Sequence, residues 1–312
     1  MKKVFVALTV VLVALLGCAP GAAPTPTEVA ATSTSTFVQP TPSYTVEVTK
    51  DIEYVTLLEP DAPVQTLDVY APTEPGPWPV VVVHHAWFQS KDNSAYTSFG
   101  EDLAGRGLVV FVPERRSESA TLIDAARDNG REFRELHESW ACAVRIARDR
   151  AVDYGGDPGW ITVFGHESAG LDAAIIGDDL QQEWDEVASN RGGPPPQTEC
   201  LAGGNSAQVD AYIAYGGDYD FYERLKESDP DLWELTSPFA LVGRNPSLQV
   251  YLLQGGMANP SWVERSVALH EALVDAGCDA TQMLLGDAES EIPWSGPDRE
   301  ELIQLILEVA RG

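Results

Sequence analysis

Six short, mostly apolar runs, spread from about residue 80 to residue 285, constrain the fold most strongly. Strands buried on both faces of a sheet read as continuous apolar runs, whereas strands with one wet face alternate. Amphipathic stretches typical of helices separate the runs, as at Phe133 to Tyr154 and Ser261 to Ala276. The pattern predicts an α/β domain with a mostly parallel twisted sheet and helices on both faces. The expected strands are Val80–Val83, Leu108–Val112, Trp160–Phe164, Val209–Tyr215, Leu248–Leu253 and Ala280–Leu285.

The rest of the domain is read from its local patterns. Asp51 to Tyr70 looks like an antiparallel opening pair of strands, and residues 178–208, rich in Gly, Pro and acidic residues, look like an insertion. With 44% hydrophobic residues, the chain has enough apolar material for one large core. We therefore predict a single domain over residues 48–312.

The N-terminus has the pattern of an export signal. Lys2 and Lys3 precede an apolar run from Val4 to Leu16, which is shorter than the ~20 residues that a membrane-spanning helix needs. The run ends in Leu15-Leu16-Gly17-Cys18, which resembles a bacterial lipobox. That resemblance implies a signal peptide over 1–17, lipidation of Cys18 and a lipid anchor on the outer face of the membrane in the bacterial cell envelope. An ordinary secretory signal and an uncleaved anchor are the alternatives.

Residues 18–47 are rich in Pro, Thr, Ser and Ala and have no hydrophobic period, so we expect a tether between the anchor and the domain. The charge of the chain is −28, from 48 acidic and 20 basic residues. So acidic a surface repels a polyanion, which argues against nucleic acid as a partner. We expect contact with the membrane only through lipidated Cys18.

Three further cysteines lie in the domain, and an exported protein can form disulfides. Cys142–Cys200 is the preferred pair, which would close a loop of 58 residues, and Cys278 is expected to be a small buried core residue. Three free thiols are the alternative.

Several stretches resemble the α/β-hydrolase superfamily, in particular its esterase and lipase-like branch with a His-Gly oxyanion loop. Four stretches carry the likeness: Asp68 to Pro72, Pro79 to Trp87, Gly107 to Arg116, and Asp153 to His166, which runs from Asp-Tyr-Gly-Gly-Asp-Pro into a strand. The resemblance implies an α/β-hydrolase fold over nearly the whole domain. It also implies a nucleophile on a sharp strand-to-helix elbow, written G-x-S-x-G.

The elbow can be read in two registers. Counting from Gly165 places Glu167 on the elbow, with Ala169 and Gly170 where small residues are wanted. The other register makes Ser168 the nucleophile, in a segment that resembles the G-E-S-A-G of carboxylesterases, but it puts His166 in place of the first small residue. We favour Glu167 at the elbow and keep Ser168 as the alternative nucleophile.

The other two triad places also lack the expected residue types. The family's acid follows the strand that ends at Leu253, where Ala258 stands, and its His follows the last strand, where Ser290 stands. A serine hydroxyl without an adjacent base is a poor nucleophile. The three places together predict a degenerate triad at Glu167, Ala258 and Ser290.

The resemblance assigns His84, His85, Ala86 and Trp87 to the oxyanion loop. His85 stands where that loop prefers Gly, although the amides of Ala86 and Trp87 remain available. Neighbouring residues on a strand point to opposite faces, so His84 and His85 are poorly placed to share a metal ion. No metal and no cofactor is expected.

Two hypotheses follow. The first is a membrane-tethered α/β-hydrolase-fold lipoprotein that resembles carboxylesterases, has lost catalysis and binds a small-molecule or protein ligand through the old cleft. The second is an active carboxylic-ester hydrolase with Ser168 as nucleophile.

Overall fold

The computed structural model describes residues 43–57, 64–87, 89–115, 131–167, 170–179, 182, 186, 198–255, 258–285 and 297–312. Four of the predicted features lie outside the described residues: the signal peptide with Cys18, most of the tether, Ser168 and Ser290. Strand β1 (Val46–Leu57) begins two residues before the predicted domain start at 48, so the last two residues assigned to the tether belong to a strand.

The described residues form one mixed sheet with the strand order β6-β1-β2-β4-β3-β5-β7-β8-β9. From β4 to β9 all neighbouring strands are parallel, while β2 is antiparallel to β4 and β1 is antiparallel to both β2 and β6. After β1, the strands are β2 (Gln65–Pro72), β3 (Trp78–His84), β4 (Val109–Pro113), β5 (Gly156–His166), β6 (Thr198–Cys200), β7 (Ala211–Tyr215), β8 (Gln249–Gly255) and β9 (Asp279–Leu285).

All six predicted apolar runs overlap parallel strands, three of them beginning one or two residues early, and the opening pair is β1 and β2. The sequence did not predict β6, which lies inside the expected insertion and pairs with β1 through Val55 and Cys200. Three residues are too few to show a hydrophobic period, which explains the omission.

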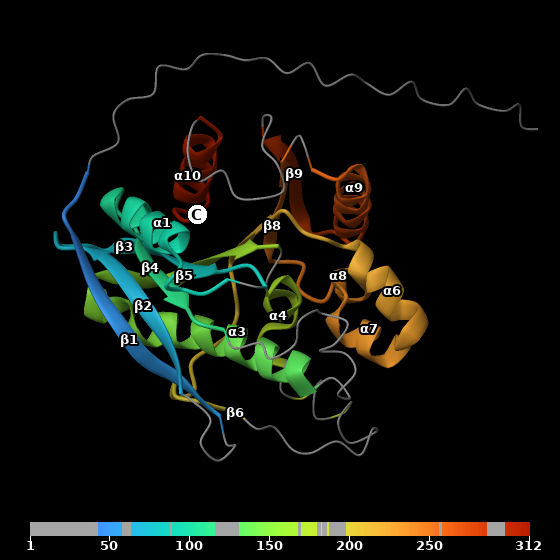
Figure 1. Cartoon of the computed structure of the whole chain (residues 1–312), viewed down its shortest axis with the longest axis horizontal. Coiled ribbons are helices and arrows are strands. Elements are labelled where there is room, and N and C mark those ends of the chain that lie inside the picture. Colours follow the sequence, from blue (N-terminus) through green and yellow to red (C-terminus); the bar gives the residue numbers. More distant parts are fainter. Residues whose placement is uncertain are drawn as a thin grey trace, which may run out of the picture. The chain divides into compact units, whose positions relative to one another are not determined.

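Helices cover both faces of the sheet, as predicted. Helix α1 (Ser94–Gly105) and α10 (Pro297–Val309) pack on one face through Phe99, Leu103, Leu302 and Ile306. Helices α3 (Arg131–Arg150), α4 (Leu171–Ile176) and α9 (Pro260–Asp275) contribute to the core of the other face. Figure 1 shows α1 and α10 on the opposite side of the sheet from α3. Helices α6 (Asp220–Ser228), α7 (Pro230–Thr236) and α8 (Pro238–Leu241) connect β7 to β8.

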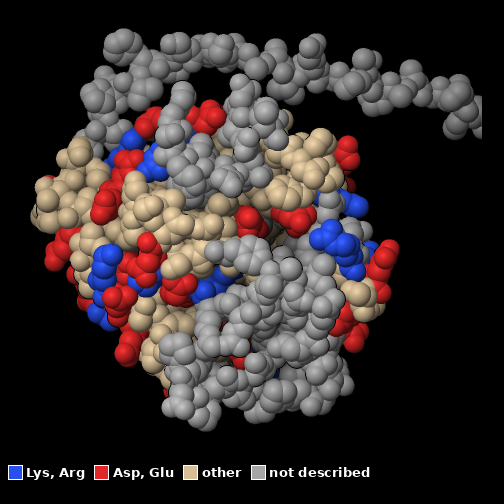
Figure 2. All heavy atoms as spheres, in the orientation of Figure 1, with Lys and Arg blue, Asp and Glu red and all other residues tan. Residues whose placement is uncertain are grey.

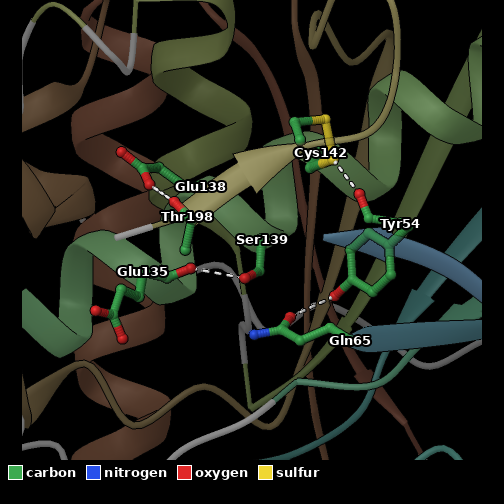
Figure 3. Close-up of a disulfide and its surroundings, with 8 residues drawn as sticks. Tyr54, Gln65, Glu135, Glu138, Ser139, Cys142 and Thr198 are labelled. Atoms are coloured by element: carbon green, nitrogen blue, oxygen red, sulfur yellow. Dashed lines mark hydrogen bonds between the residues drawn. A yellow bond between two sulfur atoms is a disulfide. The ribbon is translucent and has the colours of Figure 1, made fainter. Parts of the chain in front are cut away.

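A disulfide joins Cys142 on α3 to Cys200 on β6 (Figure 3). It is the pair that the sequence favoured, and it fastens the shortest edge strand to the longest helix. Thr198 of β6 also donates a hydrogen bond to Glu138 of α3. Cys278 is buried and unpaired.

Within the described ranges, no helix combines the length and the apolar character needed to cross a bilayer. Acidic side chains are spread over the face seen in Figure 2, with basic ones among them.

Candidate functional site

The carboxyl ends of three adjacent strands bring the predicted site residues together. Strand β3 lies between β4 and β5 and runs parallel to both, so residues 84–87, 114–115 and 166–167 leave the sheet at the same edge. In open α/β sheets, ligand sites form at this edge.

Glu167 occupies the turn that follows β5. Its φ is +56°, in the left-handed region that non-glycine residues rarely adopt, and its amide donates to the carbonyl of Tyr215 at 2.7 Å. Such a backbone costs about 1–3 kcal/mol and persists where the surrounding structure enforces it. It is the sharp strand-to-helix turn on which this fold places a nucleophile. Glu167 is exposed, and the next described residue, Gly170, precedes α4.

The carboxylate of Glu167 binds the oxyanion loop. Its Oε2 accepts a hydrogen bond from the backbone amide of Trp87 at 3.1 Å. The resemblance had assigned that amide to stabilising an oxyanion. Here the donor is engaged by an acidic side chain of the protein itself.

The second amide of the loop is also engaged. The amide of Ala86 donates to the hydroxyl of Tyr96 at 2.9 Å, and that hydroxyl lies 2.6 Å from Nδ1 of His166. The pKa of His166 is lowered to about 3, mainly by burial and to a smaller extent by the neighbouring charges of His85 and Arg115. Burial raises the pKa of Tyr96 above its usual value. The neutral imidazole of His166 therefore accepts a hydrogen bond from the Tyr96 hydroxyl. That hydroxyl in turn accepts a hydrogen bond from the Ala86 amide.

His84 and His85 have different surroundings. His84 lies near Trp140 and close to Gly170, and burial lowers its pKa to about 3. His85 packs against Tyr96, and its Nε2 lies 3.2 Å from a carboxylate oxygen of Glu114. In the described part of the chain, no three His, Cys, Asp or Glu side chains are grouped in a way that could hold a metal ion.

Arg115 is a site residue that the sequence did not single out. It follows β4, is buried, and places its guanidinium carbon 4.7 Å from the ring centre of Trp87 and 5.7 Å from that of Trp140. Burial lowers its pKa to about 10, and the negative charge of nearby Glu167 opposes that shift. The available signal was charged residues directly after an all-apolar strand.

A buried His–Asp pair lies on the helices beside the elbow and was also missed. Nε2 of His137 on α3 is 2.7 Å from Oδ2 of Asp172 on α4, and both side chains are almost inaccessible. The His137 ring stacks on Trp140 with centres 5.1 Å apart. A histidine on the apolar face of an amphipathic helix was the only signal in the sequence.

The acid place of the triad holds Ala258, as counted from the sequence. Ala258 is buried just beyond β8, and its amide donates to the carbonyl of Gly255 at 3.0 Å. A methyl group cannot orient or charge a histidine. The histidine place, Ser290, lies outside the described residues.

The sheet order, the helices on both faces and the strained turn after β5 define an α/β-hydrolase fold of the esterase type. Residues 47–153 match the family model described as platelet-activating factor acetylhydrolase, isoform II. That match ends before β5 and so does not include the elbow. No curated protein sequence matches the chain significantly.

Solved structures of esterases share the fold. A truncated carbohydrate esterase from gut microbiota has a TM-score of 0.60 and 16% identity, covering 86% of this chain and 98% of its own. The butyrate-bound esterase Est2 of Thermogutta terrifontis has a TM-score of 0.56 and 20% identity, with coverages of 83% and 92%. Brefeldin A esterase, a bacterial homologue of human hormone-sensitive lipase, has a TM-score of 0.56 and 18% identity, with coverages of 88% and 79%. The chain therefore has the α/β-hydrolase fold that these esterases share.

Proposed function

We propose that the chain is a lipid-anchored envelope protein whose α/β-hydrolase domain has lost esterase catalysis and binds a ligand at the former active site. The observation that carries the proposal is the hydrogen bond from the Trp87 amide to the Glu167 carboxylate. In an esterase of this fold, a serine would stand at this turn and the amide would face the substrate oxygen.

Electrostatics supports the loss of catalysis. Acyl transfer develops negative charge on the substrate oxygen, and preorganised donors stabilise that charge. The Glu167 carboxylate, bound to the Trp87 amide, places a negative charge where the oxyanion would form and so raises the energy of the transition state. The Ala86 amide is bonded to Tyr96, so neither loop amide is left for an oxyanion.

The remaining triad places support the same reading. Ala258 supplies no acid, and the sequence supplies Ser290 where the family has its histidine. Loss of any member of a Ser-His-Asp triad typically costs several orders of magnitude in rate.

The competing function is an active carboxylic-ester hydrolase that uses Ser168. It is favoured by the fold shared with esterases, and it needs an imidazole within hydrogen-bond reach of the serine. His84 and His166, with pKa values of about 3, are weak bases for that role near neutral pH.

Covalent labelling separates the two functions. The full chain, solubilised in mild detergent and shown to be folded by circular dichroism, is treated with a fluorophosphonate probe and read by intact mass, beside assays on p-nitrophenyl butyrate. We expect no adduct and no turnover above the background of the Ser168→Ala variant. An adduct that maps to Ser168, with turnover abolished in Ser168→Ala, would refute the proposal.

The anchor is tested separately, in bacteria grown with a labelled fatty acid. We expect the label in the wild-type chain and in the membrane fraction, and neither in Cys18→Ala. Cys278→Ala is the matched control because it removes a cysteine far from the signal. Equal labelling of wild type and Cys18→Ala would exclude lipidation at Cys18.

A further inference from the structure

Four buried N–H donors around Arg115 have no hydrogen-bond acceptor among the described residues. They are Nε and Nη2 of Arg115 and the indole Nε1 atoms of Trp87 and Trp140. Buried polar groups are paired in roughly nine of ten cases, so a cluster of unpaired donors indicates an acceptor that the described residues do not provide. Arg115 is only 6% exposed, which makes the unpaired charge especially costly.

The two unpaired atoms of Arg115 form one edge of its guanidinium. The N–H bonds at Nε and Nη2 point the same way, and their spacing matches the two oxygens of a carboxylate. Trp87 and Trp140 lie against the guanidinium, at 4.7 and 5.7 Å from its carbon, and restrain its orientation. The donor edge is therefore held in place before any ligand arrives.

The acidic side chains nearby have other partners. Glu167 accepts from the Trp87 amide, and Glu114 accepts from the Ser90 hydroxyl and the Lys91 amide. Both lower the cost of the buried Arg115 charge through space, but neither hydrogen-bonds to the Nε and Nη2 edge.

We infer that Arg115 binds the carboxylate of a small organic monoacid through its Nε and Nη2 edge, with the two indole rings beside it. The inference rests on the proposed function, because it identifies the ligand class of the same site. A monoanion fits better than phosphate, since a second negative charge would lie close to Glu167 and Glu114.

The test measures the affinity of benzoate, acetate and inorganic phosphate for the full chain by isothermal titration calorimetry. We expect benzoate to bind more tightly than phosphate. Arg115→Gln and Arg115→Lys should each weaken benzoate about tenfold or more, because both lose the two-donor edge while Lys keeps the charge. Arg150→Gln, an exposed arginine paired with Asp153, should leave the affinity unchanged.

A third variant tests the inference even if the Arg115 variants do not fold. Glu167→Gln keeps an acceptor for the Trp87 amide and removes one negative charge, so benzoate should bind roughly two- to fivefold more tightly. The inference would be overturned if the wild type did not bind benzoate. It would also be overturned if Arg115→Lys bound benzoate as tightly as the wild type, or if Glu167→Gln bound it no more tightly.

The outcome is separable from that of the proposed function. A Ser168 adduct with benzoate binding that depends on Arg115 refutes the loss of catalysis and leaves the carboxylate site standing. No adduct and no benzoate binding leaves the loss of catalysis standing and removes the carboxylate site.

Discussion

Two buried cations, Lys91 and Arg115, sit near the ends of neighbouring strands and differ in how their donors are used. The ammonium of Lys91 contacts Asp51 at 2.8 Å, Asp68 at 2.9 Å and Asp92 at 3.1 Å, so each of its three donors has a carboxylate. Burial lowers the pKa of Lys91, but the three hydrogen bonds outweigh it and the pKa lies above its usual value.

Arg115 is buried nearly as deeply, and burial lowers its pKa to about 10, since no carboxylate in the described part of the chain hydrogen-bonds to its guanidinium. Lys91 ties the loop after β3 to β1 and β2, whereas Arg115 keeps two donors open in the candidate site. The fold thus surrounds Lys91 with carboxylates, where it joins two strands to a loop, and leaves Arg115 incompletely paired at the site proposed for a ligand.

The largest effect is expected from removing the satisfied cation. Lys91→Met leaves Asp68 buried without its main partner and should lower the free energy of unfolding by about 3–5 kcal/mol in urea titrations. Arg115→Met should cost clearly less, because Nε and Nη2 of Arg115 have no hydrogen bond to lose among the described residues. Lys50→Met is the control: Lys50 is exposed and 3.9 Å from Asp68, so its loss should cost less than about 1 kcal/mol. Equal losses for Lys91→Met and Arg115→Met would show that the carboxylate partners of Lys91 add nothing to stability.

The next largest effect is expected from the disulfide, which joins α3 to the edge strand β6 beside β1. Replacing Cys142 and Cys200 together by Ala should cost about 2–4 kcal/mol, because the open loop of 58 residues gains entropy in the unfolded chain. The measurement is urea unfolding without reductant. Cys278→Ala should lose about 1 kcal/mol or less, and a double variant no weaker than this control would show that the disulfide contributes little.

A smaller effect is expected within the site. Tyr96→Phe removes the hydroxyl that accepts the Ala86 amide and contacts His166, leaving a buried amide unpaired at a cost of about 2 kcal/mol. Tyr70→Phe is a matched control because the Tyr70 hydroxyl is buried and has no hydrogen-bond partner among the described residues. Thermal unfolding should show a lower melting temperature for Tyr96→Phe alone, and similar values for the two variants would contradict the network.

The smallest effect is the pH dependence of stability near neutrality. His84 and His166 have folded-state pKa values of about 3, below the usual 6.5, so the unfolded chain binds more protons between those values. Their contribution is complete above pH 6.5 and is lost as the pH falls, by about 1 kcal/mol per histidine at pH 5.5. Urea titrations at pH 7.5 and 5.5 should give a smaller difference for His84→Gln than for wild type. An unchanged difference would mean that His84 is not held neutral.

The prediction of the fold succeeded where burial leaves a direct mark on the sequence. Val80–Val83 and Ala211–Tyr215 are apolar throughout because both faces of these parallel strands are covered. Strand β6 left no such mark, since it is defined by its pairing with β1 and by the disulfide rather than by its own residues.

The candidate site was likewise predictable only in part. Spacing from Gly165 placed Glu167 at the turn after β5, because the strand sets the count of residues to its end. Spacing could not place the carboxylate on the Trp87 amide, or bring Arg115 and Tyr96 near that carboxylate, because these residues come from different loops and helices.

Local pattern and spacing were enough to predict the layered α/β architecture and the residue types at the elbow. They favoured the Cys142–Cys200 pair but left three free thiols as an alternative, because the pairing depends on a contact between residues far apart in the chain. Which donors are paired and which have no partner among the described residues follows from the packing of distant elements. Hydrogen bonding between residues as far apart as Trp87 and Glu167 depends on packing, which no local pattern of the sequence contains.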